Sequence, residues 1–313
     1  MRLILFLFAF NFLCCRCSSA FYPGVLTKPT VTIFQRVAFS VQGMAEQQIT
    51  NSTTSTYSTA DRLKSQIIQF GAILDRGQSY NPTSGSFYAD RMAAAKTKIE
   101  ELVTSSKASA IPASLQDMEG EWELVLTTVP HGIFRSSPFF LAIQEAYATV
   151  GEIDKANLFF KLHELQTCSW GISKIGRVAQ RINATEGVLS SEFDTALFSL
   201  TTVPILGWGK LLPTFGGCVV TISNASMNAS EPGLLNLEVD YTTAKPVDGL
   251  SGLGEFIWNK KVPVGRIWKY LPWNKGRSAA CKLYCRYVDG EMRIMEDIDG
   301  EYFVYVRPVC PRT

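Results

Sequence analysis

The spacing of apolar residues changes along the chain from a helical period to a strand period. Between residues 61 and 103, apolar side chains return every three to four positions, which is the spacing of one face of an amphipathic helix. The stripe of the first helix consists of Leu63, Ile67, Phe70 and Leu74. Gly77 stops this helix, and a second helix follows from about residue 87 to residue 103. We expect a helical hairpin that packs against the outside of a sheet, in preference to an arm that binds a partner.

From residue 113 onward the pattern is that of β-strands. Between residues 121 and 128, Trp122, Leu124 and Leu126 alternate with polar residues, so all three should point into one core. Further strand-like runs span residues 177–183, 187–193, 218–222 and 234–241. Together with three C-terminal strands they make about eight, the number at which an antiparallel barrel can enclose one small ligand.

The C-terminal stretch, residues 281–308, predicts a three-stranded antiparallel meander. Asp289-Gly290 and Asp299-Gly300 each separate two runs of β-forming residues, and Asp-Gly favours a two-residue type I′ turn. The register expected from such turns places Arg286 opposite Arg293 and Tyr284 opposite Met295. Because both faces of the meander carry apolar side chains, both must be covered. We expect a barrel interior on one face and a helix, a neighbour or a lipid surface on the other.

The N-terminus has the features of two targeting sequences. Residues 1–20 contain an apolar run from Leu3 to Leu13, which is too short to cross a bilayer as a helix, and end in small residues; this predicts a signal peptide. Phe21–Ala60 holds one acidic residue and many Ser and Thr, a transit-peptide composition that we assign to residues 21–45. The expected domains that follow are a helical hairpin with its linker at 46–112 and a barrel at 113–313.

Five short motifs, in the same order along the chain, resemble those of the plastid lipid-associated protein (fibrillin) family. They are Asp75-Arg76-Gly77, Gly120-Glu121-Trp122, Ser136–Phe140, Gln180–Asn183 and the closing strands Tyr287–Ile294 and Asp299–Val304. The chain departs from the family at Glu296-Asp297, where an Arg-Gly pair is usual. The junction Ser18-Ser19-Ala20-Phe21 resembles the presequences that route proteins into plastids of algae with a secondary plastid.

This resemblance implies both a fold and a function. The implied fold is mainly β with α: a lipocalin-like antiparallel β-barrel preceded by an N-terminal helical hairpin. The implied function is binding or sequestration of hydrophobic isoprenoids or other lipids, such as carotenoids and quinones, at thylakoids or plastoglobules of the chloroplast. The expected partners are therefore a hydrophobic small molecule and a membrane or lipid-droplet surface, with no cofactor.

Gly120-Glu121-Trp122 also resembles the opening strand of lipocalins, in which the tryptophan lies at the closed end of the barrel beneath an arginine from the last strands. By that resemblance Arg293 stacks on Trp122 in a cation–π contact. Phe139 and Phe140 follow Pro138 in a short predicted helix, where they either plug the barrel mouth or pack in the core. The expected ligand-binding residues, in the barrel interior or at its mouth, are Trp122, Leu124, Leu126, Phe139, Phe140 and Arg293.

Residues 256–277 combine aromatic and basic side chains and contain no acidic residue. Aromatic rings at headgroup level beside cations that pair with lipid phosphates are typical of a membrane-contacting surface. The expected membrane contacts are Trp258, Lys260, Lys261, Trp268, Lys269 and Trp273. The alternative is an ordinary hairpin with a solvated basic edge.

Charge and cysteine content narrow the function classes. Removal of Arg2 and Arg16 with the signal peptide leaves 28 basic and 28 acidic residues, so bulk charge disfavours a nucleic-acid partner. Sequons at Asn51, Asn183, Asn224 and Asn228 would suit the alternative of a secreted protein. The five cysteines outside the signal peptide show no disulfide framework, which favours the plastid.

The chain shows no motif for catalysis. The two histidines, His131 and His163, stand apart from each other and from cysteines, so a zinc site is not expected. Gly249–Leu253 lacks the final glycine of a Gly-x-Ser-x-Gly nucleophile turn. The acidic residues near the last turn, Glu291, Glu296, Asp297, Asp299 and Glu301, are interpreted as a solvated edge. We therefore expect no enzyme.

Three alternatives to a lipid-binding barrel remain open. The first is a structural coat on lipid droplets whose barrel is filled by its own side chains. The second is a secreted lipocalin-type carrier. The third is an enzyme that acts on an isoprenoid, which would need Asp289, Glu291 or Tyr302 in a pocket.

Overall fold

The computed structural model describes residues 58–80, 85–106, 110–129, 132–167, 173–197, 215–246, 259–270 and 276–311. The chain divides into two units, residues 1–56 and 57–313, and every described residue belongs to the second. The expected signal peptide at 1–20 and transit peptide at 21–45 lie outside the described residues.

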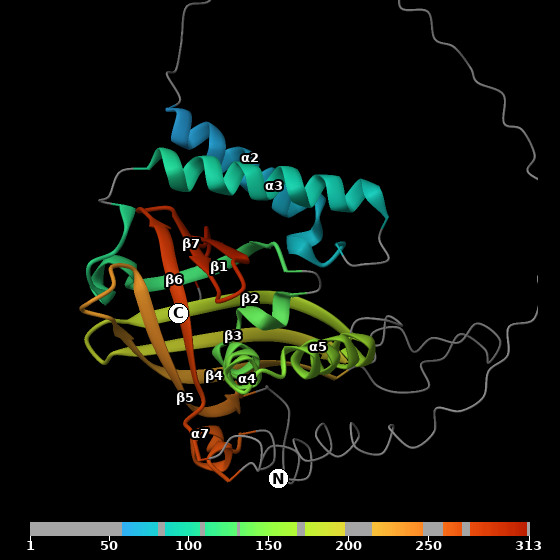
Figure 1. The fold of residues 1–313 in the computed structure, drawn as a ribbon, viewed down its shortest axis with the longest axis vertical. Coiled ribbons are helices and arrows are strands. Elements are labelled where there is room, and N and C mark those ends of the chain that lie inside the picture. The colour runs from blue at the N-terminus through green and yellow to red at the C-terminus, as the bar shows by residue number, and fades with distance from the viewer. Residues whose placement is uncertain are drawn as a thin grey trace, which may run out of the picture. The chain divides into compact units, whose positions relative to one another are not determined.

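Eight antiparallel strands close into a barrel in sequence order, with β8 paired to β1 (Figure 1). The strands are β1 (Gly120–Thr127), β2 (Ser173–Asn183), β3 (Val188–Leu197), β4 (Phe215–Met227), β5 (Leu234–Ala244), β6 (Ala280–Val288), β7 (Met292–Glu296) and β8 (Tyr302–Val306). Helices accompany the barrel, so the prediction of a mainly β fold with α elements and an antiparallel eight-stranded barrel is confirmed.

The helices begin and end at residues suited to those positions. They are α2 (Thr59–Ile73), α3 (Ser86–Ser105), α4 (Pro138–Thr149), α5 (Ile153–Thr167) and α7 (Val264–Trp268), with the 3₁₀ turns η2 (Asp75–Gly77), η4 (Leu115–Met118) and η5 (Gly132–Ser136). Ser58 caps α2, since its hydroxyl accepts from the backbone of Asp61 and the Asp61 carboxylate accepts from the backbone of Ser58. Pro138 stands in the first turn of α4, where its missing N–H is not needed.

The barrel sheet separates two apolar clusters. The inner cluster lies inside the barrel and includes residues of α4, η5 and all strands. The outer cluster lies between the outer face of the sheet and the helices α2 and α3, which run side by side across the barrel in Figure 1. Its strand residues are Leu126, Tyr287, Met292, Ile294 and Val304.

The motif Asp75-Arg76-Gly77 fastens the end of α2 to the barrel. A side chain at Gly71 or at Gly77 would collide with the backbone of β1, at the carbonyl oxygens of Val125 and Thr127 respectively. Arg76 donates to the carbonyl oxygens of Ile175 and Gly176 on β2. Both Asp75 and Arg76 adopt positive φ, a costly conformation for a residue with a side chain. Close packing against the barrel compensates for that cost.

The C-terminal meander forms where it is expected but in another register. Arg293 lies opposite Val288, and Tyr284 lies opposite Glu296. The expected pairs that are wrong are Arg286 with Arg293 and Tyr284 with Met295. Arg293 nevertheless points into the barrel beside residues of the inner cluster.

Turn chemistry explains the change of register. Neither Asp289 nor Gly290 has the positive φ of a type I′ turn; instead Oδ1 of Asp289 accepts from the backbone N–H groups of Glu291, at 2.8 Å, and Met292, at 2.7 Å. A β-bulge between Cys285 and Tyr287 then shifts the pairing again. The register was predicted for a type I′ turn. The turn that forms is stabilised instead by hydrogen bonds to the Asp289 side chain, so the register differs.

Leu126 points to the outside of the barrel, contrary to the alternation pattern. Trp122 and Leu124 belong to the inner cluster, whereas Leu126 belongs to the outer one. The pairing of β1 with β8 shifts between Leu124 and Leu126, and this irregularity reverses the facing of the residues that follow. The expectation that Leu126 lies in the barrel interior is therefore wrong, and it packs instead near Gly71 of α2.

Candidate functional site

A fully buried guanidinium lies inside the barrel. Arg293 is 0% exposed, and its Cζ lies 5.2 Å from the centre of the Trp122 ring and 4.5 Å from that of Tyr305. Its Nη2 donates to Oε1 of Gln180 at 2.6 Å. The contact with Trp122 that the sequence led us to expect is therefore present.

Burial destabilises the charged form of Arg293 more than its neighbours stabilise it. Desolvation lowers the pKa of Arg293 to about 10, and nearby Arg307 acts in the same direction. Among the described residues Arg293 forms no ion pair, and its Nε and Nη1 find no hydrogen-bond acceptor. Ring faces stabilise a cation without accepting its hydrogen bonds in the plane of the guanidinium. A charged side chain is thus buried with part of its donors unused.

A row of polar side chains continues from Arg293 around the barrel wall. Gln180 is the cross-strand partner of Trp122 on one side and of Ser191 on the other, and Ser191 faces Thr221. All four point inward, because directly opposed residues share a face of the sheet. The hydroxyls of Ser191 and, one pair further on, Ser223 are buried without a hydrogen-bond partner.

The closed end of the barrel is built around Trp122. Its Nε1 donates to the carbonyl oxygen of Met118 in η4 at 2.8 Å, and Arg307 lies with its Cζ 3.7 Å from the ring centre. An open cleft of about 510 Å³ lies outside this end, between β1, β2 and the residues after β8. Both acidic and basic residues line this cleft, and its Glu121 is already paired with Arg177 and Arg181, so the cleft is a poor candidate for the site of an apolar ligand.

The opposite end is closed by η5 and α4, which together we call the plug (residues 132–149). Ser136 is buried, and its carbonyl oxygen accepts from Nε2 of Gln180 at 2.9 Å. Tyr305 lies beside the Ser136 side chain, and burial raises the pKa of that tyrosine. The plug therefore reaches from the barrel mouth to the polar row around Arg293.

Aromatic rings cover the mouth around the plug. Phe140 lies within 6.5 Å, centre to centre, of Phe134, Phe139, Phe159 and Phe160. Phe139 also meets Trp268 of α7 edge to face at 5.9 Å. These rings are contributed by η5, α4, α5 and α7. Phe139 and Phe140 are half-buried and pack against the inner cluster at this end of the barrel, so their position combines the two placements that the sequence allowed.

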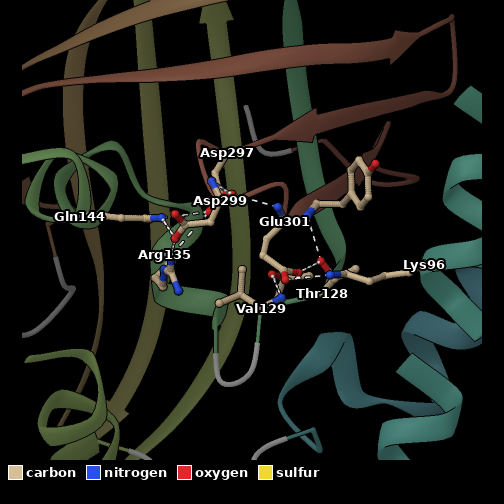
Figure 2. A network of polar contacts seen from close by, with 10 residues as sticks. Lys96, Thr128, Val129, Arg135, Gln144, Asp297, Asp299 and Glu301 are labelled. Atoms are coloured by element: carbon tan, nitrogen blue, oxygen red, sulfur yellow. Dashed lines mark hydrogen bonds and ion pairs between the residues drawn. The ribbon is translucent and has the colours of Figure 1, made fainter. Parts of the chain in front are cut away.

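Carboxylates of the β7–β8 turn hold the plug in place (Figure 2). Arg135 of η5 lies 3.5 Å from Asp297 and 3.2 Å from Asp299, and Gln144 of α4 donates to both carboxylates. Asp297 is buried, and this burial raises its pKa despite the neighbouring Arg135. Asp297 is therefore not part of the solvated edge that we expected from the sequence, whereas Asp299 and Glu291 are exposed as expected.

The same turn also contacts α3 (Figure 2). Glu301 accepts from Nζ of Lys96 at 2.7 Å and from the hydroxyl of Thr128, and that hydroxyl accepts from the backbone of Tyr302 at 2.8 Å. One turn thus fastens both the plug inside the barrel and a helix outside it.

The basic surface around α7 differs from the expected one in its aromatic members. Trp268 is only 3% exposed and packs in the inner cluster, so it does not contact a membrane in this arrangement. The exposed apolar residues are Ile267 at 45% and Tyr270 at 87%. Lys260, Lys261 and Lys269 are exposed as expected, and Trp258 and Trp273 lie outside the described residues.

Two kinds of reactive group, metal-ligating side chains and thiols, can be located in the described residues. No group of three or more His, Cys, Asp or Glu residues is placed there to hold a metal ion. Cys281 and Cys285 are buried free thiols, and burial raises the pKa of Cys285 to about 12, which keeps it protonated. No described helix combines the length and the apolar character needed to cross a membrane.

The sequence identified some members of the interior site and missed others. Trp122, Leu124 and Arg293 lie together in the interior, and Phe139 and Phe140 cover its mouth. Sequence reasoning missed Gln180, Ser191, Tyr305 and the plug residue Ser136. The first three alternate in phase with apolar residues of their own strands, as Gln180 does with Val178 and Ile182, and that pattern could have indicated them. The depth of the plug has no signal in the sequence.

No protein-family model matches this chain, and no curated protein or solved structure matches it.

Proposed function

We propose that this chain is a lipocalin-like lipid-binding protein, with a helical hairpin (α2 and α3) before the barrel. It sequesters a hydrophobic isoprenoid or another lipid in the barrel, and it works at thylakoids or plastoglobules of a plastid. No enzymatic step is part of this function. The resemblance to plastid lipid-associated proteins suggests the location, and the barrel supports the binding role.

The observation that best supports lipid binding is the group of aromatic rings that covers one end of the closed barrel. The other end is sealed by Trp122, Met118 and Arg307, whereas the mouth is closed by a separate segment, the plug, with rings on several helices. Apolar side chains line most of the interior, which suits a ligand that is largely hydrocarbon. Because side-chain contacts with α4 can be broken without opening the sheet, the mouth is the end at which a lipid can enter.

The test is the lipid content of the purified protein. The full-length chain is exposed to thylakoid lipid extract, re-isolated, extracted with organic solvent and analysed by mass spectrometry. We expect one isoprenoid or other lipid per chain, and faster loss of it from Phe140→Ala, which removes a ring from the cover. Phe87→Ala, on the exposed surface of α3, is the matched control and should leave the exchange rate unchanged. Absence of stoichiometric lipid from the wild type would contradict the proposal.

A structural lipid-droplet coat is the second candidate, and the continuity of the inner cluster favours it. Side chains from Trp122 at the closed end to Leu141 of the plug belong to one buried cluster. For a coat, the surface around α7 is what matters, since Ile267 and Tyr270 stand out among exposed lysines. This candidate predicts binding to lipid surfaces without an extractable ligand.

Charge reversal separates the surface role from the interior role. Lys260→Glu with Lys269→Glu should weaken co-sedimentation with anionic liposomes by at least about 30-fold, because each basic residue near such a surface contributes about 1 kcal/mol. The matched control is Arg62→Glu with Arg91→Glu on the exposed faces of α2 and α3. Equal losses in both pairs would show that α7 has no special role.

A further inference from the structure

The interior of the barrel contains a charge that nothing in the described chain neutralises. Arg293 is completely buried, forms no ion pair with a described residue, and leaves Nε and Nη1 without acceptors. The titratable groups that act on it are Tyr305, Cys285 and Arg307; the first two are kept neutral by burial, and none of the three is a carboxylate. A buried charge is ordinarily paired or fully hydrogen-bonded, so this arrangement is incomplete as it stands.

Hydroxyl groups without partners lie along the same wall. Ser191 is the cross-strand neighbour of Gln180, whose amide oxygen accepts from Arg293. The hydroxyls of Ser191 and Ser223 are buried and unpartnered, and both can donate to an acceptor within the barrel. Three side chains on β3, β4 and β7 therefore offer unused donors to the interior.

The unused donors indicate which class of ligand fits the barrel. A pure hydrocarbon leaves every one of them unpaired, and a neutral carbonyl accepts hydrogen bonds without cancelling the charge of Arg293. A carboxylate does both, and it matches the planar guanidinium in shape. The apolar inner cluster beyond the polar row suits the hydrocarbon part of such a molecule.

We propose that the barrel binds a long-chain lipid carboxylate, with its ionised head group against the guanidinium of Arg293, whose Nε and Nη1 lack acceptors, and its chain among the apolar residues of the inner cluster. This inference rests on the proposed function, since it names the class of lipid that the barrel carries. Arg293 is a binding residue in this account, and Trp122 and Tyr305 position its guanidinium.

The test compares an acid with its ester. cis-Parinaric acid and its methyl ester share one hydrocarbon chain and fluoresce when they enter an apolar site, so their affinities for the full-length chain can be titrated directly. We expect the acid to bind about tenfold to a hundredfold more tightly, which is the range for hydrogen bonds to a charged group in a buried site. Arg293→Met should keep the affinity for the ester and lose the preference for the acid.

Two matched variants test whether the effect belongs to this guanidinium. Arg307→Met removes the other cation over Trp122 and should retain the preference for the acid. Ser191→Ala with Ser223→Ala removes only hydroxyl groups and should reduce the preference without abolishing it. The wild-type comparison of acid and ester needs no variant, so the test holds even where Arg293→Met does not fold.

Three other results would contradict the inference, and each contradicts a different part of it. Equal binding of acid and ester by the wild type refutes the carboxylate site but leaves lipid binding intact. Binding of neither probe refutes both this inference and the proposed function. A preference that survives in Arg293→Met, or that disappears equally in Arg307→Met, places the recognition of the acid elsewhere.

Discussion

The inner and outer faces of the barrel sheet meet different neighbours. On the outside, α2 and α3 cover apolar strand residues, and charged groups at the border are paired, as with Lys64 and Asp289 at 3.0 Å and Lys96 and Glu301 at 2.7 Å. On the inside, Nε and Nη1 of the buried Arg293 and the hydroxyls of Ser191 and Ser223 lack hydrogen-bond partners. Among the described residues, none that forms this outer contact has a buried side-chain polar atom without a partner. The interior does have such atoms, and this difference separates a packing interface from a candidate binding site.

Substitution of Trp122 is expected to have the largest effect on the stability of the protein, because this side chain contacts both Arg293 and Arg307 at the closed end of the barrel. Trp122→Ala should destabilise the protein by about 3–5 kcal/mol, because it leaves a cavity and releases Arg293 and Arg307 from its ring. Urea unfolding of Trp122→Ala, Arg293→Met and the double variant should give a coupling energy of about 1–2 kcal/mol. Additivity within about 0.5 kcal/mol would show that the two side chains do not stabilise each other.

A smaller effect is expected where α2 approaches the outside of the barrel. Gly71→Ala places a methyl group against the carbonyl oxygen of Val125 and should cost about 1–3 kcal/mol in the free energy of unfolding. Gly290→Ala is the control, since nothing lies within 4 Å of a side chain there. Its effect should stay within about 0.5 kcal/mol. Equal effects of the two substitutions would mean that α2 is not packed tightly on β1.

The smallest effect is the pH dependence of the contact between α2 and the β6–β7 turn. Although burial opposes it, hydrogen bonds from the Tyr287 hydroxyl, the turn backbone and Lys64 keep the pKa of Asp289 below its ordinary value of 3.8. Because the folded pKa is the lower one, the stabilisation is present above the unfolded pKa and is lost as the pH falls through the folded value. Asp289→Asn should therefore lower the urea midpoint at about pH 6 and have less effect at about pH 3.

An exposed carboxylate provides the control for that experiment. Asp90→Asn on α3 should change the midpoint little at either pH. A difference between wild type and Asp289→Asn that grows as the pH falls would contradict the assignment of Asp289 as an ionised partner of Lys64.

The strands and helices were predictable because they depend on local periodicity. The run at Leu63 and Ile67 predicted α2, and the alternation around Trp122 predicted β1. The closed antiparallel barrel followed from the number of such runs. The contact of Arg293 with Trp122 could be predicted only through the resemblance to lipocalins.

What could not be predicted depended on single irregularities and on contacts between distant segments. A β-bulge turned Leu126 outward, and an aspartate-stabilised turn at Asp289 moved the register of β7. The burial of Trp268 and Asp297 depends on the position of α4, which periodicity does not specify. Local periodicity therefore predicted the helices and strands. Their register and their contacts depended on side-chain hydrogen bonds and irregularities that periodicity does not specify.

The ionisation state of a bound carboxyl group tests the central claim most directly. Palmitate labelled with ¹³C at its carboxyl carbon is bound to the full-length protein, and its NMR shift is followed as the pH is lowered over the range in which the protein stays folded. An ion pair with Arg293 predicts that the bound carboxyl remains ionised through about pH 4 to 5, where carboxyl groups in water become protonated. Titration of the bound signal in that ordinary range, or absence of a bound signal, would contradict the account.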